Sequence, residues 1–338
     1  AALSLLALLL IALTVAQRGP LPLTRFREPT WVLHACLLLF LLARRDVRSA
    51  LRTAAATAWR FLAQPVFFPT LTGILLVLHL GTSLTRHLSF HTFSHDFSLF
   101  DLALVPHAGE DPLYTPVLER SFLSEHFSPF LFLLQPLRAL CDSPLLLVLL
   151  HPLALWAGVL LLRRLLDDEG VPPAVRNLAC LVYLCHPVTA TTLDSVFHVE
   201  VFLAPTLFGL HLLRRAGPAW AYGAVLVLAL AVKEDVGIYL CGYAAWLAVA
   251  ERRHRRAAIT AAAGLVWTVV AVTLLIPRFA PDEQGFRFLT RWASWGDGVG
   301  DILLGFARHP VLFLRSLAAP DYLRFFACLL FTPFLRRW

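Results

Sequence analysis

Residues 219–250 read AWAYGAVLVLALAV-KED-VGIYLCGYAAWLAVA, so that two apolar runs meet at a triplet of charged residues. Lys233 of this triplet is the only lysine among the 29 lysine and arginine residues of the chain. Ionisable groups between two membrane-grade segments cost free energy unless they have partners or reach water. The triplet therefore indicates a functional site, and the alternative is a short polar turn between two helices.

The composition differs from that of a soluble domain. Hydrophobic residues make up 58% of the 338 residues and charged residues only 15%, against about 25% charged residues in soluble domains. The net charge of +7 would suit nucleic acid, but the arginines stand in pairs between apolar runs, as they do in cytoplasmic loops. We therefore expect an all-α, polytopic integral membrane protein whose partner is the lipid bilayer, with no nucleic acid partner.

Ten apolar segments are candidates for membrane spans, each of which needs about 20 residues. Several are shorter, so only their centres are predicted. The chain opens inside the first without an initiator methionine, and we expect a truncated start and allow for an incomplete C-terminus. We divide it into extra N-terminal membrane segments, 1–65, and a main transmembrane domain, 66–338. The candidate spans are Ala1–Ala16, Trp31–Ala43, Val66–Leu84, Pro144–Leu162, Ala174–Thr189, Phe197–Leu213, Ala219–Val232, Val236–Ala250, Ala257–Ile276 and Tyr322–Phe334.

The basic residues predict the orientation of these spans. Arginines precede the third span and follow the fourth, sixth and eighth. If all of them are cytoplasmic, the spans alternate correctly, provided that Phe127–Leu140 does not cross. This 14-residue segment contains Pro129 and Pro136 and suits an interfacial or re-entrant helix. The alternative is that it crosses, which would place Arg163 and Arg164 outside.

The same orientation gathers acidic residues on the extracytoplasmic side. Acidic residues contribute little to orientation, so their gathering needs another cause, and a shared site on that face is the simplest. The residues are Asp96, Asp101, Glu110, Asp111, Glu119, Glu125, Asp194, Glu200, Glu234 and Asp235.

The hydrophilic stretch Thr85–His126 is expected to be a long first extracytoplasmic loop with short helices on the membrane surface. Loops of this length are usually functional or disordered, and its aromatic residues argue against disorder. Asp96 and Asp101 are five residues apart, so on a helix they diverge by about 140° and only one can face a shared ligand. A carboxylate there can act as a general base; the alternative is a helix N-cap or a surface charge.

Histidines add two weaker patterns. His87, His91 and His95 recur every four residues, which on one helix would allow them to share a metal, although interfacial histidines without a function are common. A second cluster opens the sixth span, where His198 and Glu200 would diverge on a regular helix. That cluster consists of Asp194, His198 and Glu200.

Four short motifs occur along the chain: DFSLFD (96–101), EHFSP (125–129), FHVEVF (197–202) and KED (233–235). Their order resembles that in an uncharacterised bacterial and archaeal family, the DUF2079 predicted membrane proteins. With the long external loop and the arginine pair 163–164, the chain also resembles the GT-C membrane glycosyltransferases, with which that family is grouped. The resemblance covers about Val66 to Phe334. The chain departs from the family pattern at Leu102, Val105 and Val199, where Gln, Trp and Pro are usual.

The resemblance implies a GT-C-like helical bundle that transfers a sugar from a polyprenyl-phosphate donor to an acceptor outside the cytoplasm of a bacterial or archaeal cell. Asp96 would be the general base on the acceptor hydroxyl, with Asp101 as second candidate. Lys233 or an external arginine (Arg86, Arg120, Arg138, Arg287 or Arg291) would neutralise the departing phosphate. The expected substrate-binding residues are Glu125, His126, His198, Glu200, Lys233, Glu234 and Asp235.

The sequence leaves more than one interpretation of the cofactor and of the function. Glu234 and Asp235 can orient Lys233 or bind a divalent metal ion, and no ligand set has diagnostic spacing. Trp292 and Trp295 either stack on a sugar or anchor the chain in the interface. A transporter or flippase also fits charged residues at membrane segments, although we find no internal repeat. A non-catalytic member of the family that keeps only the fold is the third possibility.

Overall fold

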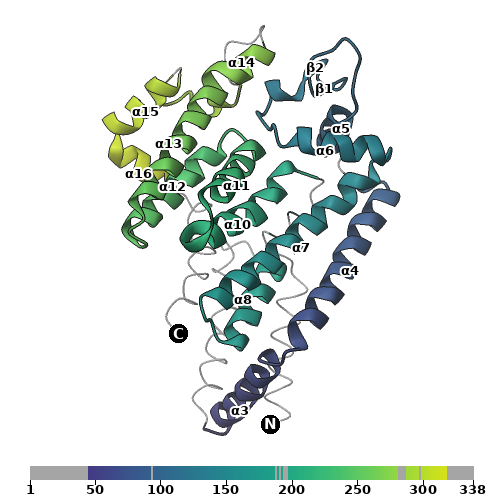
Figure 1. Cartoon of the computed structure of the whole chain (residues 1–338), viewed down its shortest axis with the longest axis vertical. Coiled ribbons are helices and arrows are strands. Elements are labelled where there is room, and N and C mark those ends of the chain that lie inside the picture. Colours follow the sequence, from purple (N-terminus) through teal and green to yellow (C-terminus); the bar gives the residue numbers. More distant parts are fainter. Residues whose placement is uncertain are drawn as a thin grey trace, which may run out of the picture. The chain divides into compact units, whose positions relative to one another are not determined.

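The computed structural model describes residues 45–92, 94–186, 189, 192, 197–280, 287–296 and 298–317 (Figure 1). Three expected spans, Ala1–Ala16, Trp31–Ala43 and Tyr322–Phe334, lie outside the described residues. The chain divides into two compact units, Ala1–Phe67 and Phe68–Trp338. The second unit contains the four motifs.

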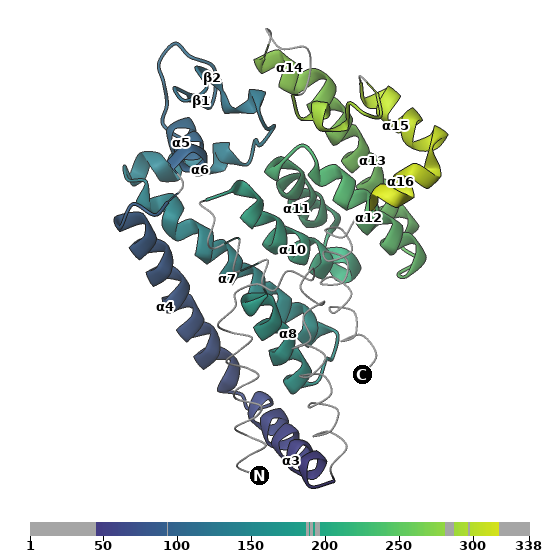
Figure 2. The ribbon, with the colours of Figure 1, turned by 180° about the vertical axis from the view of Figure 1, so that it is seen from behind.

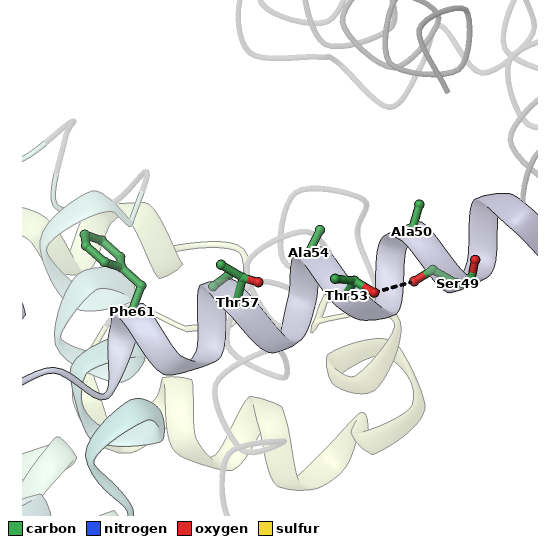
Figure 3. Close-up of a pocket in the computed structure, with 7 residues that line it drawn as sticks. Ser49, Ala50, Thr53, Ala54, Thr57 and Phe61 are labelled. Atoms are coloured by element: carbon green, nitrogen blue, oxygen red, sulfur yellow. Dashed lines mark hydrogen bonds between the residues drawn. The ribbon is translucent and has the colours of Figure 1, made fainter.

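In the first unit, the described residues form helix α3, Arg45–Leu62. Figure 3 shows a shallow concave face of this helix, lined mainly by alanine, serine and threonine and ended by Phe61. The hydroxyl of Thr53 donates to the carbonyl of Ser49 over 3.1 Å. No ionisable side chain lines this face, so the face carries no candidate chemistry.

Among its described residues, the second unit is mostly helical. Its one sheet among the described residues pairs Tyr114 with Ser121 and Thr115 with Arg120 in antiparallel register. In chain order the elements are α4 Phe67–Leu88, α5 Ser94–Ala103, β1 Tyr114–Thr115, β2 Arg120–Ser121, η2 Phe122–Ser124, α6 Leu131–Leu140, α7 Leu145–Asp168, α8 Pro173–Cys185, η3 Val199–Phe202, α10 Leu203–Ala216, α11 Ala219–Val232, α12 Val236–Val249, α13 His254–Val270, the π-turn η4 Ala271–Leu275, α14 Ile276–Phe279, η5 Arg287–Trp292, α15 Val299–Arg308 and α16 Pro310–Leu317.

Three stretches among the described residues are long and apolar enough to cross a membrane: α4, α7 and the continuous stretch His254–Phe279. They contain most or all of the expected spans 66–84, 144–162 and 257–276. Helix α11 has the predicted bounds, and α12 ends one residue early. With α8, these two are apolar helices of 13 or 14 residues, shorter than the roughly 20 that a span needs. The expected span 197–213 starts as the 3₁₀ turn η3 and becomes α-helical only from Leu203.

Two expectations for the outer loop need correction. His87 is in α4, which ends at Leu88, whereas His95 is in α5. Phe90, between these helices, has a φ of 59°, a left-handed conformation that does not continue a helix. The three histidines therefore do not share one helix face. The loop also contains the β1–β2 hairpin, where only short helices were expected.

Two glycines allow a close contact between two helices at the site. Helix α12 packs along α13, and Gly237 faces Gly264 so closely that a methyl group on either would overlap the other's backbone. Glycines allow such close approach of helices in membranes. The hydroxyl of Thr268 on α13 consequently reaches the carbonyl of Glu234 over 2.8 Å. Helix α10 packs against α7 on one side and α11 on the other (Figures 1 and 2).

At the ends of α10 and α12 that lie away from the KED motif, arginines bind two glutamates. Arg214 pairs with Glu169, and Arg215 binds Glu251 through two hydrogen bonds of 2.8 and 3.0 Å. Arg256 donates to main-chain carbonyls at the end of α10 and just after it. Since a helix of 14 residues is about 21 Å long, this arginine cluster lies about that far from the ends that carry Lys233 and Asp235.

Candidate functional site

A cavity of about 870 Å³ opens between the outer loop and the ends of α11, α12 and α13. It collects side chains from segments that are far apart in the sequence. Its ionisable lining residues are His95, Asp96, Glu125, His126, His198, Glu200, Lys233, Glu234, Asp235 and Arg291. Every expected site residue except Asp101 is among them, so the structure brings together eight of the nine. Asp194 lies outside the described residues.

The motif EHFSP is fastened to the motif KED. The carboxylate of Glu234, 3% exposed as a residue, accepts from Nδ1 of His126 and from the main-chain N–H of Phe127, each over 2.9 Å. The N–H of Phe130 donates to the carbonyl of Ala231 over 2.8 Å at the end of α11, and the ring of Phe127 packs on Trp267. Glu234 therefore holds the loop against the helices rather than facing a ligand with both oxygens.

Lys233 is held by two hydrogen bonds, one through its side chain and one through its carbonyl. Its Nζ donates to Oε1 of Glu200 over 2.6 Å, and the indole N–H of Trp267 donates to its carbonyl over 3.1 Å. The residue has an extended conformation (φ −165°, ψ 159°) that ends α11. Burial works to lower the pKa of Lys233, but the charge and hydrogen bond of Glu200 outweigh it, and the pKa lies above its usual value. The ammonium group is therefore charged and fixed at the cavity wall.

The two candidate bases of the loop have different surroundings. Asp96, in the first turn of α5, lines the cavity with its side chain 53% exposed, and its Oδ2 lies 3.9 Å from Nε2 of His198. Asp101 is not among the lining residues; its carboxylate accepts from Nε of Arg138 over 3.0 Å. Arg138 is 7% exposed and also binds Asp142 over 2.6 Å. The predicted divergence of the two aspartates on a helix is therefore observed.

The irregular backbone at η3 places two of the predicted site residues, His198 and Glu200, at the same cavity. His198 is extended (φ −134°, ψ 136°) and Glu200 follows within the 3₁₀ turn, so the divergence expected on a regular helix does not apply. Oε1 of Glu200 binds Lys233, whereas its Oε2 is buried without a hydrogen-bond partner. Glu125 is engaged as well, because Arg120 donates to its Oε1 over 2.9 Å.

Asp235 precedes α12 and lines the cavity. It makes no capping hydrogen bond through its side chain. Burial raises the pKa of Asp235; the positive charge of Lys233 opposes this, and the carboxylates of Glu234 and Glu200 add to it, so that the pKa lies above its usual value. A partly buried carboxylate in such surroundings takes up a proton more readily than an exposed aspartate does.

Sequence reasoning missed the apolar wall of the cavity. It is formed by Ile238 of α12 together with Val269 and Val272 of α13 and its π-turn. π-turns inside helices occur frequently at functional sites, but this one follows from no local sequence signal. Of the two tryptophans, Trp292 lines the cavity, whereas Trp295 packs on Phe306 and Phe313.

Within the described part of the chain, no group of three or more His, Cys, Asp or Glu side chains is arranged to hold a metal ion. The divalent-metal alternative therefore gains no support from the cavity's carboxylates, most of which already bind protein donors.

A family model described as "Predicted membrane protein (DUF2079)" matches residues 86–338, well over half of the chain. The match contains the cavity and all four motifs. No curated protein and no solved structure matches the chain.

Proposed function

The chain belongs to the DUF2079 family of predicted membrane proteins, and on this basis we propose that it is a membrane glycosyltransferase whose active site is the cavity between the outer loop and α11–α13. The donor is a sugar on a polyprenyl phosphate, and transfer takes place at the extracytoplasmic face. One observation carries the proposal: four separated motifs place histidines, carboxylates and the ammonium group of Lys233 around one cavity of about 870 Å³.

The chemistry of the cavity suits this substrate. A lipid-linked sugar has a phosphate that gains charge as the glycosidic bond breaks, and preorganised cations stabilise such charge. Lys233 and Arg291 both line the cavity. The hydrocarbon chain needs an apolar surface, which Ile238, Val269 and Val272 offer beside these cations.

The location of the cavity fits an outer-face enzyme. The cavity is at the ends of α11–α13 opposite the arginine cluster of Arg214, Arg215 and Arg256. Arginines gather on the cytoplasmic side of membrane proteins, so the cavity belongs on the other side. A polyprenyl-linked donor reaches that side within the bilayer, without free diffusion from the cytoplasm.

In the reaction, the acceptor oxygen attacks the anomeric carbon and forms the new glycosidic bond. The bond from that carbon to the phosphate oxygen breaks, and its electron pair stays on polyprenyl phosphate. The acceptor's proton passes to a carboxylate. Asp96, the sequence-based candidate, stands at the exposed rim near His198, and Asp235, which also lines the cavity, is the alternative candidate.

The proposal is tested with the purified protein in lipid nanodiscs. Polyprenyl-phosphate glucose, mannose and arabinose serve as donors and glycerol as surrogate acceptor, and release of polyprenyl phosphate is followed by mass spectrometry. We expect turnover with at least one donor and its loss in Lys233→Met. Arg164→Met, which removes a 71% exposed cation from the end of α7, is the matched control and should keep turnover. Movement of intact donor between leaflets without bond cleavage would instead support a flippase.

A further inference from the structure

The five carboxylates that line the cavity are not equivalent. Four of them have protein partners: Glu234 binds His126 and Phe127, Glu200 binds Lys233, Glu125 binds Arg120, and Asp96 lies within 4 Å of His198. Among the described residues, the side chain of Asp235 makes neither a hydrogen bond nor an ion pair. Both of its oxygens are therefore open to a ligand, whereas Glu200 offers only its Oε2 and Asp96 lies 3.9 Å from His198.

In the described part of the chain, charged and polar residues surround Asp235 without pairing with its carboxylate. Lys233 and Glu234 stand on the same turn, Glu200 comes from η3, His126 from the outer loop, and Tyr239 from the first turns of α12. The positive charge of Lys233 favours the ionised form of Asp235, but its ammonium group donates its hydrogen bond to Glu200. Asp235 therefore faces two fixed carboxylates in a partly buried position, and this environment makes its carboxylate a stronger base than an exposed one.

We propose that Asp235 is the catalytic residue that accepts the proton of the acceptor hydroxyl. This inference rests on the proposed function. The hydroxyl O–H bond breaks as the oxygen bonds to the anomeric carbon, and its proton moves to an oxygen of Asp235. The electron pair of the cleaved carbon–oxygen bond remains on the polyprenyl phosphate, and the proton then leaves Asp235 for solvent. Atoms and charge balance without a further reactant.

The position of Asp96 favours a role in substrate binding rather than in proton transfer. It stands at the rim, half-exposed to solvent and beside the imidazole of His198. A general base works best when its pKa is near the operating pH and when water is excluded. Asp235 is partly buried, and this burial raises its pKa and limits its contact with water, whereas Asp96 is 53% exposed. Asp96 instead binds an acceptor hydroxyl, together with His198.

The test compares Asp235→Asn, Asp235→Glu and Asp96→Asn in nanodiscs with the same three donors and glycerol. We expect Asp235→Asn to lower kcat by about a hundredfold or more, the contribution of a general base, while donor binding measured by native mass spectrometry is retained. Asp235→Glu should restore part of the turnover and shift the acidic limb of the pH–rate profile. Asp96→Asn should mainly raise the KM for glycerol.

A second measurement separates catalysis from folding. A carboxyl whose pKa is raised in the folded state costs stability when ionised, so Asp235→Asn should unfold at the same temperature as the wild type or higher. Retained kcat in Asp235→Asn, or loss of kcat in Asp96→Asn alone, would overturn the inference and leave the proposed function standing. If the wild type cleaves none of the donors, the proposed function fails and the inference falls with it.

Discussion

Nδ1 of His126 lies 2.9 Å from Oε1 of Glu234, although the two residues are 108 positions apart in the chain. The other oxygen of Glu234 accepts the main-chain N–H of Phe127. One buried carboxylate thus joins the outer loop to the seam between α11 and α12.

We expect Glu234→Ala to loosen the outer loop. The change leaves the N–H of Phe127 and the ring of His126 without their acceptor, and an unsatisfied buried donor costs about 1–3 kcal/mol. Limited proteolysis should cut residues 104–120 faster than in the wild type, and the unfolding temperature should fall. Glu234→Gln keeps one acceptor oxygen and should show a smaller effect.

Glu110→Gln is the matched control for this prediction, because Glu110 is an exposed residue of the same loop. It should leave both the proteolysis rate and the unfolding temperature unchanged. Equal proteolysis of Glu234→Ala and the control would show that Glu234 does not hold the loop.

Gly237→Ala should destabilise the contact of α12 with α13. The added methyl group would overlap the carbonyl oxygen of Gly264 and the hydroxyl of Thr268, and such overpacking costs about 1–3 kcal/mol. The displaced Thr268 would also lose its hydrogen bond to Glu234. Thermal unfolding in detergent measures the effect. Gly242→Ala, on the same helix with open space around it, is the control and should be at least as stable as the wild type.

Asp101→Asn should act on stability. Asp101 is the partly buried partner of Arg138, and weakening a hydrogen bond between charged groups costs about 1–3 kcal/mol. Asp142 binds the same arginine, but its side chain is 94% exposed, so Asp142→Asn should have a much smaller effect on the unfolding temperature. A larger effect of Asp142→Asn than of Asp101→Asn would contradict the assignment of Asp101 as a structural partner.

The arginine cluster predicts a pH dependence of stability. The hydrogen bond from Arg215 lowers the pKa of Glu251 from 4.5 to about 2, against the opposing effect of burial. A carboxyl with a lowered folded-state pKa stabilises the fold above its unfolded pKa and loses this contribution as the pH falls through its folded pKa. The stability contributed by Glu251 should therefore be full above about pH 4.5 and vanish towards pH 2.

The measurement compares the unfolding temperatures of the wild type and Glu251→Gln between pH 3 and 7. Their difference should be constant at the upper end and shrink below pH 4.5. A difference that grows as the pH falls would contradict the ion-pair account of this cluster.

Helices around the site could be predicted from the sequence wherever local signals for their ends were strong. Pro218 and the charged triplet bound the run 219–232, and α11 begins and ends there. The common location of the carboxylates also followed from the sequence, because the basic residues fix which helix ends lie together. The convergence of Asp96, Glu125, Glu200 and Lys233 on one cavity agrees with that expectation.

Roles within the site could not be read from the sequence, because they depend on contacts between distant segments. Glu234 looked like a ligand-binding residue until its bonds to His126 and Phe127 were known. Asp101 looked like a second base, but its partner Arg138 lies 37 residues away. The hairpin at Tyr114–Ser121 is too short to show the alternation of apolar and polar residues that predicts strands.

The central claim is that the outer loop and the helix ends form one site on the extracytoplasmic face. Cysteine accessibility in whole cells tests it most directly, with His95→Cys on the loop, Ile238→Cys on α12 and Ala250→Cys at the other end of α12, each in a background without native cysteines. A membrane-impermeant maleimide should label positions 95 and 238 in intact cells and position 250 only after permeabilisation. If 95 and 238 are labelled from opposite sides, the shared site does not exist, and the glycosyltransferase proposal fails with it.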